Sequence, residues 1–469
     1  MPFQLHGMTD STFYLQPLYN LFNLNTFKIS IYGEINNFLA DHFNPFLLVL
    51  FPLASIFNPI VFLNFLIVVS YSTFFTIVYT FMSKKINIVM FSMLLFSIPV
   101  LFFNFYLNFN GFHPVVLAPI FLIISYNYLF VEENANKSLL WFMPLLLIKE
   151  EFWLLLVFLS FSLFIRFNKI KYIFLTVVSA VLFISIYKLM SILYSENAAG
   201  IHSGHYAYIF DAANFKDLLD SIFNLAHWDR RILFIVLFFF PFLMLIDLKK
   251  IVLKDWITLV LIIGPTFGYC ILSRQIPMTY WLFEHYALPV LPVVLIIVKK
   301  YGTFTNKRLL LFFFINTSLI ASVISLKQPW QYKYYQDEKQ LQEQVIPKLD
   351  LNFKDFLLVE DRTGVYFSEY QVDYVQYLNF MNNKNKIAKY VIFNTRYSYL
   401  ANNIKYNTTT NKKASYDYIL NIMKDLNSYE IIYAKYPFVI YKHNSVSKIQ
   451  ISATLLDQWD KKTIKSNKW

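Results

Sequence analysis

Long apolar runs, separated by short polar turns, dominate the chain from its beginning to about residue 326. Runs of this kind match the roughly 20 apolar residues that an α-helix needs to cross a bilayer. We predict membrane segments at residues 59–82, 86–106, 112–130, 139–148 with 152–165, 172–194, 231–248, 256–272, 285–298 and 308–326. The pattern therefore predicts an all-α polytopic transmembrane bundle of about nine or ten membrane segments.

One charged cluster interrupts this pattern inside a predicted membrane segment. Lys149, Glu150 and Glu151 stand between the apolar runs 139–148 and 152–165. A charge at bilayer depth costs about 2.5–3.5 kcal/mol on insertion scales, so charges there are usually paired and functional. Two interpretations remain open: an ion pair that closes a helix hairpin, and a site that binds an anionic headgroup or sugar hydroxyls.

Basic residues in the short loops set the predicted orientation, because loops rich in Lys and Arg face the cytoplasm. These residues are Lys84, Lys85, Arg166, Lys169, Lys171, Lys249, Lys250, Lys254, Lys299, Lys300, Lys307 and Arg308. All of them lie on one side only if residues 139–165 enter and leave on the same face. We therefore predict that residues 139–165 form a hairpin of two short helices, broken at Lys149-Glu150-Glu151.

The other polar motifs fall on the opposite, outer side of this topology. They are Asp41-His42, Gly111-Phe112-His113-Pro114, Gly204-His205-Tyr206 and Glu284-His285-Tyr286, together with the charged triplet. We predict a shared site near the outer boundary of the membrane, because carboxylates, a Lys and His-aromatic pairs all lie at this face.

The two candidate catalytic acids, Asp10 and Asp41, each have a structural and a functional interpretation. Asp41 precedes a short apolar helix and suits its N-cap, while Asp10 suits a cap or a turn. The functional interpretation makes one of them a general base that acts on an acceptor hydroxyl.

The histidines and their neighbours are candidate substrate-binding residues. His42 adjoins Asp41, and His113 precedes a proline at a helix start, where a structural role is also open. The remaining candidates are His205, Tyr206, Arg274, His285 and Tyr286. The two His-Tyr pairs equally suit an aromatic belt at headgroup level.

The pattern changes after residue 326 to a polar tail rich in Tyr, Asn and Lys. Short alternating runs predict strands at 356–359, 389–393, 431–434 and 438–441, and a helix at 414–426. We therefore expect three parts. They are an outer-face N-terminal segment with short interfacial helices (1–58), a transmembrane domain (59–326) and a small extracytoplasmic α/β domain (327–469).

Composition agrees with the membrane class, since 57% of the residues are hydrophobic and only 15% are charged. The net charge of +12 does not indicate nucleic acid, because much of the Lys flanks apolar segments. The single Cys270 excludes an internal disulfide. No spacing matches a zinc site, a Gly-rich phosphate loop or a nucleophile elbow. We therefore identify no cofactor and no metal ligands, and a divalent metal requirement stays open.

The polar motifs also carry a family resemblance. They are Asp10 with Gln16, Asp41-His42-Phe43-Asn44-Pro45, Phe112-His113-Pro114, Lys149-Glu150, Gly204-His205-Tyr206 and His285-Tyr286 with Pro289. Together they resemble an uncharacterised family of predicted prokaryotic membrane proteins, a domain of unknown function that is similar to the GT-C glycosyltransferases. The resemblance covers most of the chain, including the α/β tail.

The resemblance implies a GT-C-like bundle in the cell membrane, with its active site at the outer face. Such an enzyme takes sugar from a polyprenyl-phosphate donor and passes it to an envelope acceptor. By position Asp10 matches the family's catalytic acid best, with Asp41 second. Lys149 would neutralise donor phosphate, and the His-Tyr pairs would line the sugar or phosphate pocket. Family members typically begin with a membrane helix before the Asp10 region, so we expect a truncated or divergent N-terminus here.

A second hypothesis comes from a different class: a non-catalytic lipid- or glycan-binding membrane protein, or a carrier. The triplet and the His-Tyr pairs would then recognise a headgroup without chemistry. A carrier needs a polar path through the membrane. Few ionisable residues are expected deep on the cytoplasmic half, with Lys188 the main exception, which counts against transport.

Overall fold

The computed structural model describes residues 9–24, 38–41, 43–54, 56–106, 112–193, 213–223, 228–272, 287–327, 339–352, 355–359, 361–367, 370–374, 388–394, 429–435 and 438–443. These residues form two compact units. The helical unit contains the described helices between Leu39 and Gln328. The second unit joins the helix near the N-terminus to the strands that follow Pro329. The predicted helix at 414–426 lies outside the described residues.

The longer helices of the helical unit are α3 (Phe46–Ala54), α4 (Pro59–Met82), α5 (Ile88–Ser97), α7 (Ala118–Phe130), α8 (Ala135–Phe142), α9 (Glu151–Phe167), α10 (Lys171–Leu193), α12 (Phe215–Phe223), α13 (Trp228–Leu243), α14 (Leu253–Leu272), α15 (Leu291–Tyr301) and α16 (Asn306–Lys327). Shorter helical turns are α2 (Phe38–Asp41), α6 (Pro99–Leu101), η1 (Phe102–Tyr106), η2 (Pro114–Leu117), η3 (Met143–Leu147) and η4 (Leu248–Lys250). The predicted segment 86–106 is interrupted between α5 and α6, where Pro99 lacks the N–H that a continuous helix needs.

Asparagine side chains determine where several of these helices begin. Asn58 accepts hydrogen bonds from the N–H groups of Ile60 and Val61 at the start of α4. Asn87 caps α5 and Asn134 caps α8 in the same way. Such caps satisfy N–H groups that have no partner within the helix.

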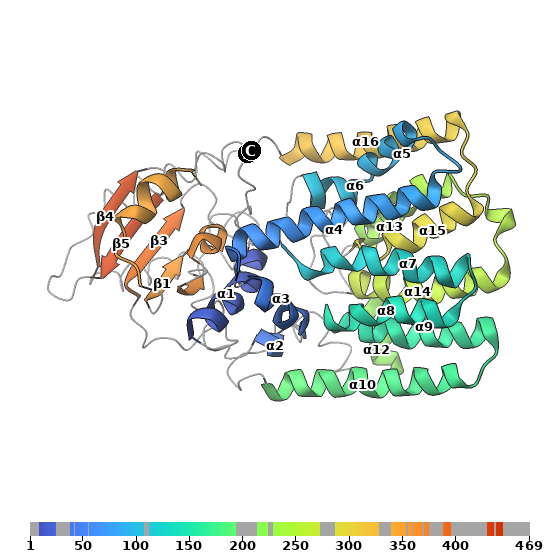
Figure 1. Cartoon of the computed structure of the whole chain (residues 1–469), viewed down its shortest axis with the longest axis horizontal. Coiled ribbons are helices and arrows are strands. Elements are labelled where there is room, and N and C mark those ends of the chain that lie inside the picture. The colour runs from blue at the N-terminus through green and yellow to red at the C-terminus, as the bar shows by residue number, and fades with distance from the viewer. Residues whose placement is uncertain are drawn as a thin grey trace. The chain divides into compact units, whose positions relative to one another are not determined.

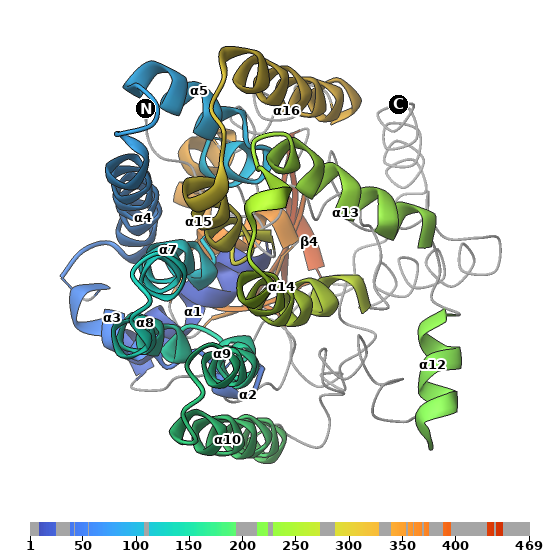
Figure 2. The same ribbon diagram turned by 90° about the vertical axis from the view of Figure 1, so that its right-hand side faces the viewer.

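Helices α8 and α9 form a hairpin. Glu133 immediately precedes α8 and Arg166 lies in the last turn of α9, yet their side chains form an ion pair of 3.4 Å. The chain therefore leaves and returns to one end, which confirms the predicted hairpin. Figures 1 and 2 show α7, α8, α9 and α10 as adjacent rods, with α14 packed against α9.

Two of the described helices are long and apolar enough to cross a bilayer: Pro59–Met82 and Lys171–Met190. Ile88–Ser97 and Pro114–Phe130 are apolar but shorter. The outward faces of the long helices carry exposed apolar side chains such as Val61 and Phe174, as expected of surfaces that face lipid rather than water. The chain is thus mostly helical, and the other predicted membrane segments stay predictions.

The second unit contains a five-stranded sheet of order β2-β1-β3-β5-β4. The strands are β1 (Phe356–Val359), β2 (Gln371–Tyr374), β3 (Tyr390–Asn394), β4 (Tyr429–Lys435) and β5 (Phe438–His443). β1 pairs in parallel with β2 and β3, while β5 pairs antiparallel with β3 and β4. The four predicted strands are confirmed, and β2 is an additional strand that the sequence pattern missed.

Helix α1 (Thr9–Leu24) belongs to this second unit. It packs on the 3₁₀ segment η9 (Asp361–Phe367). The Gln16 side-chain amide donates to the carbonyl oxygen of Tyr370 at 3.1 Å. The ring of Phe38 contacts Phe13 and Tyr14, with centroids 5.0 and 5.8 Å apart. Helix α1 is therefore packed against the chain between β1 and β2, in the same unit as the sheet.

Candidate functional site

The charged triplet occupies the break between the two helices of the hairpin. The 3₁₀ turn η3 ends at Leu147, and α9 begins at Glu151. The indole N–H of Trp153 donates to the carbonyl oxygen of Leu146 at 3.0 Å, which links the two sides of the break. Pro144 lies inside η3, and a proline there disfavours a continuous α-helix from α8 to the charged triplet. The local sequence thus places a helix break and three charged residues at the same point.

Lys149 and Glu151 form an ion pair at the break. The Lys149 ammonium donates to Oε1 of Glu151 at 2.6 Å. The Lys149 side chain is 4% exposed and that of Glu151 is 21% exposed, so the pair lies at the edge of a buried region. Ile148 and Phe152 beside it are buried. A charge in such apolar surroundings requires a partner, and Glu151 supplies one to Lys149.

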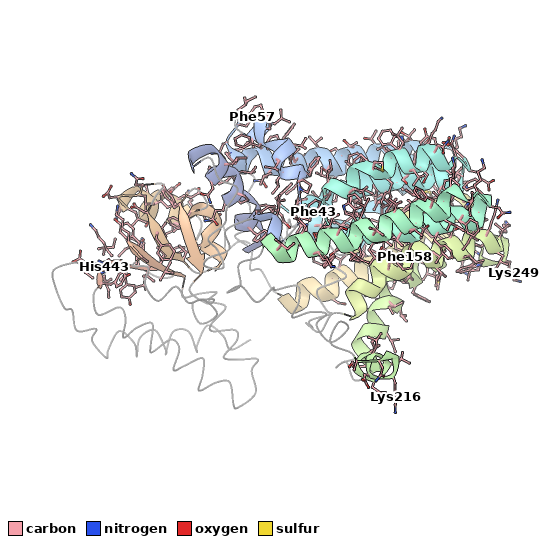
Figure 3. The ribbon with its side chains drawn as sticks, turned by 90° about the horizontal axis from the view of Figure 1, so that it is seen from below. Phe43, Phe57, Phe158, Lys216, Lys249 and His443 are labelled. Atoms are coloured by element: carbon pink, nitrogen blue, oxygen red, sulfur yellow. The ribbon has the colours of Figure 1, made fainter. Side chains whose placement is uncertain are left out.

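Glu150 connects the triplet to the segment near residue 43. The backbone N–H of Phe43 donates to Oε2 of Glu150 at 3.1 Å, although 107 residues separate them. Glu150 is 1% exposed. Figure 3 labels Phe43 within the helical unit. Two polar motifs that the sequence singled out, Asp41–Pro45 and Lys149–Glu151, therefore meet.

Two further polar side chains belong to the electrostatic surroundings of this meeting point, one adjacent in sequence and one on α10. Asn44 follows Phe43 and is 1% exposed; within the described residues its Oδ1 accepts no hydrogen bond. The hydroxyl of Tyr187, on α10, lies within electrostatic reach of both Glu150 and Glu151. The sequence pattern missed Tyr187, because an aromatic residue inside an apolar run carries no signal of proximity to the triplet.

The formal charge of the triplet sets what it can bind. One Lys and two Glu give a net charge of −1, and the Lys is already paired. The cluster therefore carries two carboxylates as hydrogen-bond acceptors, and Glu151 is its partly exposed member. It is suited to accept protons from hydroxyl groups, while an anion would have to compete with Glu151 for Lys149.

His113 has a structural role that the structure describes directly. It is the N-cap of η2, and its Nδ1 accepts the N–H of Val115 at 3.3 Å. The imidazole is 4% exposed. With Nδ1 as acceptor, the proton of the neutral ring resides on Nε2. The predicted substrate-binding role of His113 stays a prediction.

The structure describes the other predicted site residues only in part. Asp10 lies in the first turn of α1, in the second unit, and Asp41 ends α2; their side chains are outside the described residues. Also outside are His42, His205, Tyr206, Arg274, His285 and Tyr286. Among the residues that are described, no cluster of three or more His, Cys, Asp or Glu could hold a metal ion.

A second charged cluster, which the sequence pattern missed, lies at the opposite end of the hairpin. Asp255, fully buried at the start of α14, accepts from Arg166 of α9, from the Lys300 ammonium at 2.8 Å and from the Tyr301 hydroxyl. Glu133 adds ion pairs to Arg166 and to Lys254, the latter at 2.6 Å. This cluster joins α9, α14 and α15 and fixes the far end of the helix that begins with Glu151.

Comparison with known proteins identifies one relationship. Residues 4–345 match the family described as a predicted membrane protein (DUF2079). No curated protein and no solved structure matches the chain.

Proposed function

The chain belongs to the DUF2079 family of predicted membrane proteins, and on that premise we propose that it is a GT-C-like glycosyltransferase of the cell membrane. It transfers sugar from a polyprenyl-phosphate donor to an envelope acceptor. The proposal includes a polytopic arrangement of residues 59–326, with the site and the α/β domain (327–469) outside the cytoplasm. Such a donor lies at the membrane interface, so the base and the phosphate-binding groups must meet it there.

One observation carries the proposal: the hydrogen bond from the Phe43 N–H to Glu150. It brings the segment that follows Asp41 onto the charged triplet, at a break in a helix hairpin. Charges are retained in apolar surroundings at a cost, so a converging pair of polar motifs supports a functional site. The buried carboxamide of Asn44 adds a further acceptor to it.

The charges suggest how the groups share the work. Glu150 holds the 43–45 segment, while Glu151 keeps Lys149 paired and oriented until a donor phosphate competes for the ammonium. Asp41 or Asp10 then takes the proton of the acceptor hydroxyl as general base. His42, His113, His205, Tyr206, Arg274, His285 and Tyr286 are the proposed substrate-binding residues.

The test is mass spectrometry of polyprenyl-phosphate sugars and envelope glycans. A deletion strain is compared with strains complemented by wild type, by Asp10→Asn, by Asp41→Asn, or by the matched control Asp217→Asn, an exposed acid on α12. We expect one lipid-linked sugar to accumulate and one glycan to disappear, with rescue by wild type and the control but not by the variant of the catalytic acid.

Rescue by both carboxylate variants would contradict this chemistry. It would favour the alternative, a non-catalytic lipid- or glycan-binding protein or a carrier. Unchanged lipids and glycans in the deletion strain would reject the transferase altogether.

A further inference from the structure

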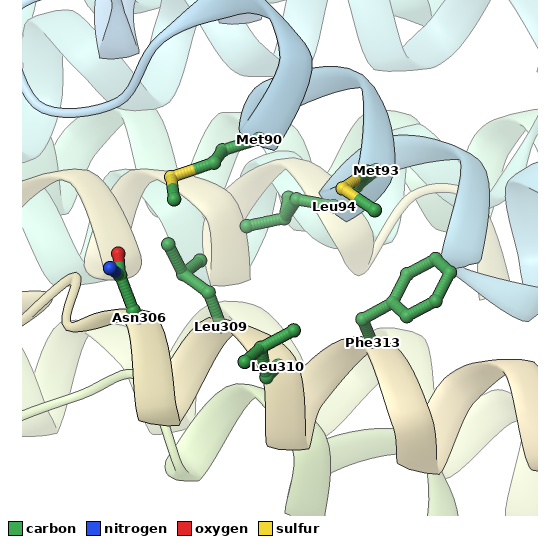
Figure 4. Close-up of a pocket in the computed structure, with 7 residues that line it drawn as sticks. All are labelled: Met90, Met93, Leu94, Asn306, Leu309, Leu310 and Phe313. Atoms are coloured by element: carbon green, nitrogen blue, oxygen red, sulfur yellow. The ribbon is translucent and has the colours of Figure 1, made fainter.

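An open groove runs between α5 and α16, far along the chain from the charged triplet. It encloses about 200 Å³ and is lined by Met90, Met93, Leu94, Asn306, Leu309, Leu310 and Phe313. Figure 4 shows Asn306 at one end, the two methionines along one wall and Phe313 at the other end. From Asn306 to Phe313 an α-helix rises roughly 10 Å. Apart from Asn306, every lining side chain is apolar.

Both helices begin at the polar end of this groove. Asn87 caps α5 three residues before Met90, and α16 starts at Asn306 itself. The turn before α5 lies against the segment before α16, because the Lys85 ammonium donates to the carbonyl oxygen of Lys299 and lies 5.9 Å from the Phe304 ring centre. The polar lining residue Asn306 and the turn that carries Lys85 therefore lie where both helices begin.

Two lysines at this end are available to a ligand. Lys84 and Lys307 are exposed, and neither has an ion-pair partner within the described part of the chain. Lys85, by contrast, donates to the carbonyl oxygen of Lys299, and Arg308 is partly buried. The apolar groove thus lies between two helices whose first turns adjoin exposed lysines without an ion pair among the described residues, Lys84 before α5 and Lys307 in α16. This combination is complementary to an acyl chain joined to a phosphate.

We propose that this groove binds an anionic glycerophospholipid, with one acyl chain along Met93, Leu94 and Leu310 and the phosphate between Lys84 and Lys307. Methionine side chains suit such a site because they adapt to irregular apolar surfaces. The site takes its lipid from the leaflet on the side of Lys84 and Lys307. It is separate from the proposed transferase site and does not depend on that activity.

The experiment is native mass spectrometry of the full chain, loaded separately with dioleoyl-phosphatidylglycerol and dioleoyl-phosphatidylcholine. We expect phosphatidylglycerol to bind more tightly. Lys84→Gln with Lys307→Gln should weaken it about tenfold or more, because each lysine near an anionic surface contributes roughly a fivefold attraction. The matched control is Lys169→Gln with Lys171→Gln, two lysines of another loop, which should leave binding unchanged.

A groove-filling variant tests the apolar half. Leu310→Trp should displace the lipid, whereas Val260→Trp on α14 should not, although both wild-type side chains are 63% exposed. Equal binding of the two lipids, or retention of phosphatidylglycerol in Leu310→Trp, would overturn the proposal. A competition assay with undecaprenyl phosphate gives a third contrary outcome. If Leu310→Trp abolishes the binding of undecaprenyl phosphate but not that of phosphatidylglycerol, the occupant of the groove is an isoprenoid and the proposal is overturned.

Discussion

The Phe43 N–H donates to Oε2 of Glu150 at 3.1 Å and joins a loop to a helix break 107 residues away. The contact uses a backbone donor, so it does not depend on the identity of the side chain at position 43. It does depend on a long side chain with an oxygen acceptor at position 150. Glu150 therefore anchors the segment that begins at Phe43 to the helix break.

The first prediction concerns this hydrogen bond. Glu150→Ala leaves the Phe43 N–H in a partly buried position without its acceptor, which costs about 1–3 kcal/mol of unfolding free energy. Glu150→Gln retains an oxygen acceptor and should cost less. Thermal unfolding in detergent measures both variants, and an equal loss in the two would contradict a role for the hydrogen bond.

The second prediction concerns the ion pair of Lys149 and Glu151. Glu151→Gln leaves a buried ammonium without its carboxylate, which costs about 3 kcal/mol, the lower end for a broken buried pair. Adding Lys149→Met should recover part of that loss, because the uncompensated charge is gone. The control is the exposed pair of Lys339 and Glu343, where the same cycle should give roughly 0.3–0.5 kcal/mol. Additive effects at 149 and 151 would show that the pair is not coupled.

The third prediction concerns Asp255, which binds Arg166, Lys300 and Tyr301. Asp255→Asn removes the charge that two cations require and should cost about 3–5 kcal/mol. Asp247→Asn removes a partly exposed carboxylate that pairs with the exposed Lys250 and should change the melting temperature little. Unfolding midpoints measured side by side decide the question; similar midpoints for the two variants would mean that the Asp255 cluster is not stabilising.

The fourth prediction concerns pH. The hydrogen bond from Lys254, with the nearby charges of Lys254, Arg166 and Lys300, holds the pKa of Glu133 below its ordinary value of 4.5. A lowered pKa in the folded state contributes stability above pH 4.5, and this stability is lost as the pH falls through the folded pKa. Melting temperatures from pH 7 to pH 3 should therefore fall less steeply in Glu133→Gln than in wild type. The difference should be small, because Glu133 is mostly exposed and its pairs are screened by water. Parallel curves would contradict the coupling.

The helix break at Lys149-Glu150-Glu151 could be predicted from the sequence, because three charges cannot continue an apolar helix without cost. The basic residues of the loops predicted the hairpin, and the ion pair of Glu133 with Arg166 confirms it. In the tail, strands such as β3 and β5 followed from short alternating runs. The strand β2 was missed because Gln371–Tyr374 is too polar to stand out, whereas β1, of the same length, is entirely apolar.

The membership of α1 in the second unit was not predictable from the pattern. Asp10 was assigned to an outer-face N-terminal segment, residues 1–58, and the family resemblance made it the best match for the catalytic acid. The hydrogen bond of Gln16 to Tyr370 spans 354 residues, and no local pattern carries such a contact. Tertiary packing decides where α1 belongs, since Phe13 and Tyr14 bury their rings in the same core as Phe38.

By itself, the sequence determined the membrane class, the positions of the apolar helices and the break in the hairpin, because these follow from hydrophobic runs and from the cost of charge among apolar residues. Only the tertiary structure decided which polar groups meet. It paired Glu150 with Phe43, Lys149 with Glu151, and Asp255 with Arg166. The physical reason is that hydrogen bonds and ion pairs act over a few ångströms, while hydropathy is a sum over a segment and contains no information about its neighbours in space.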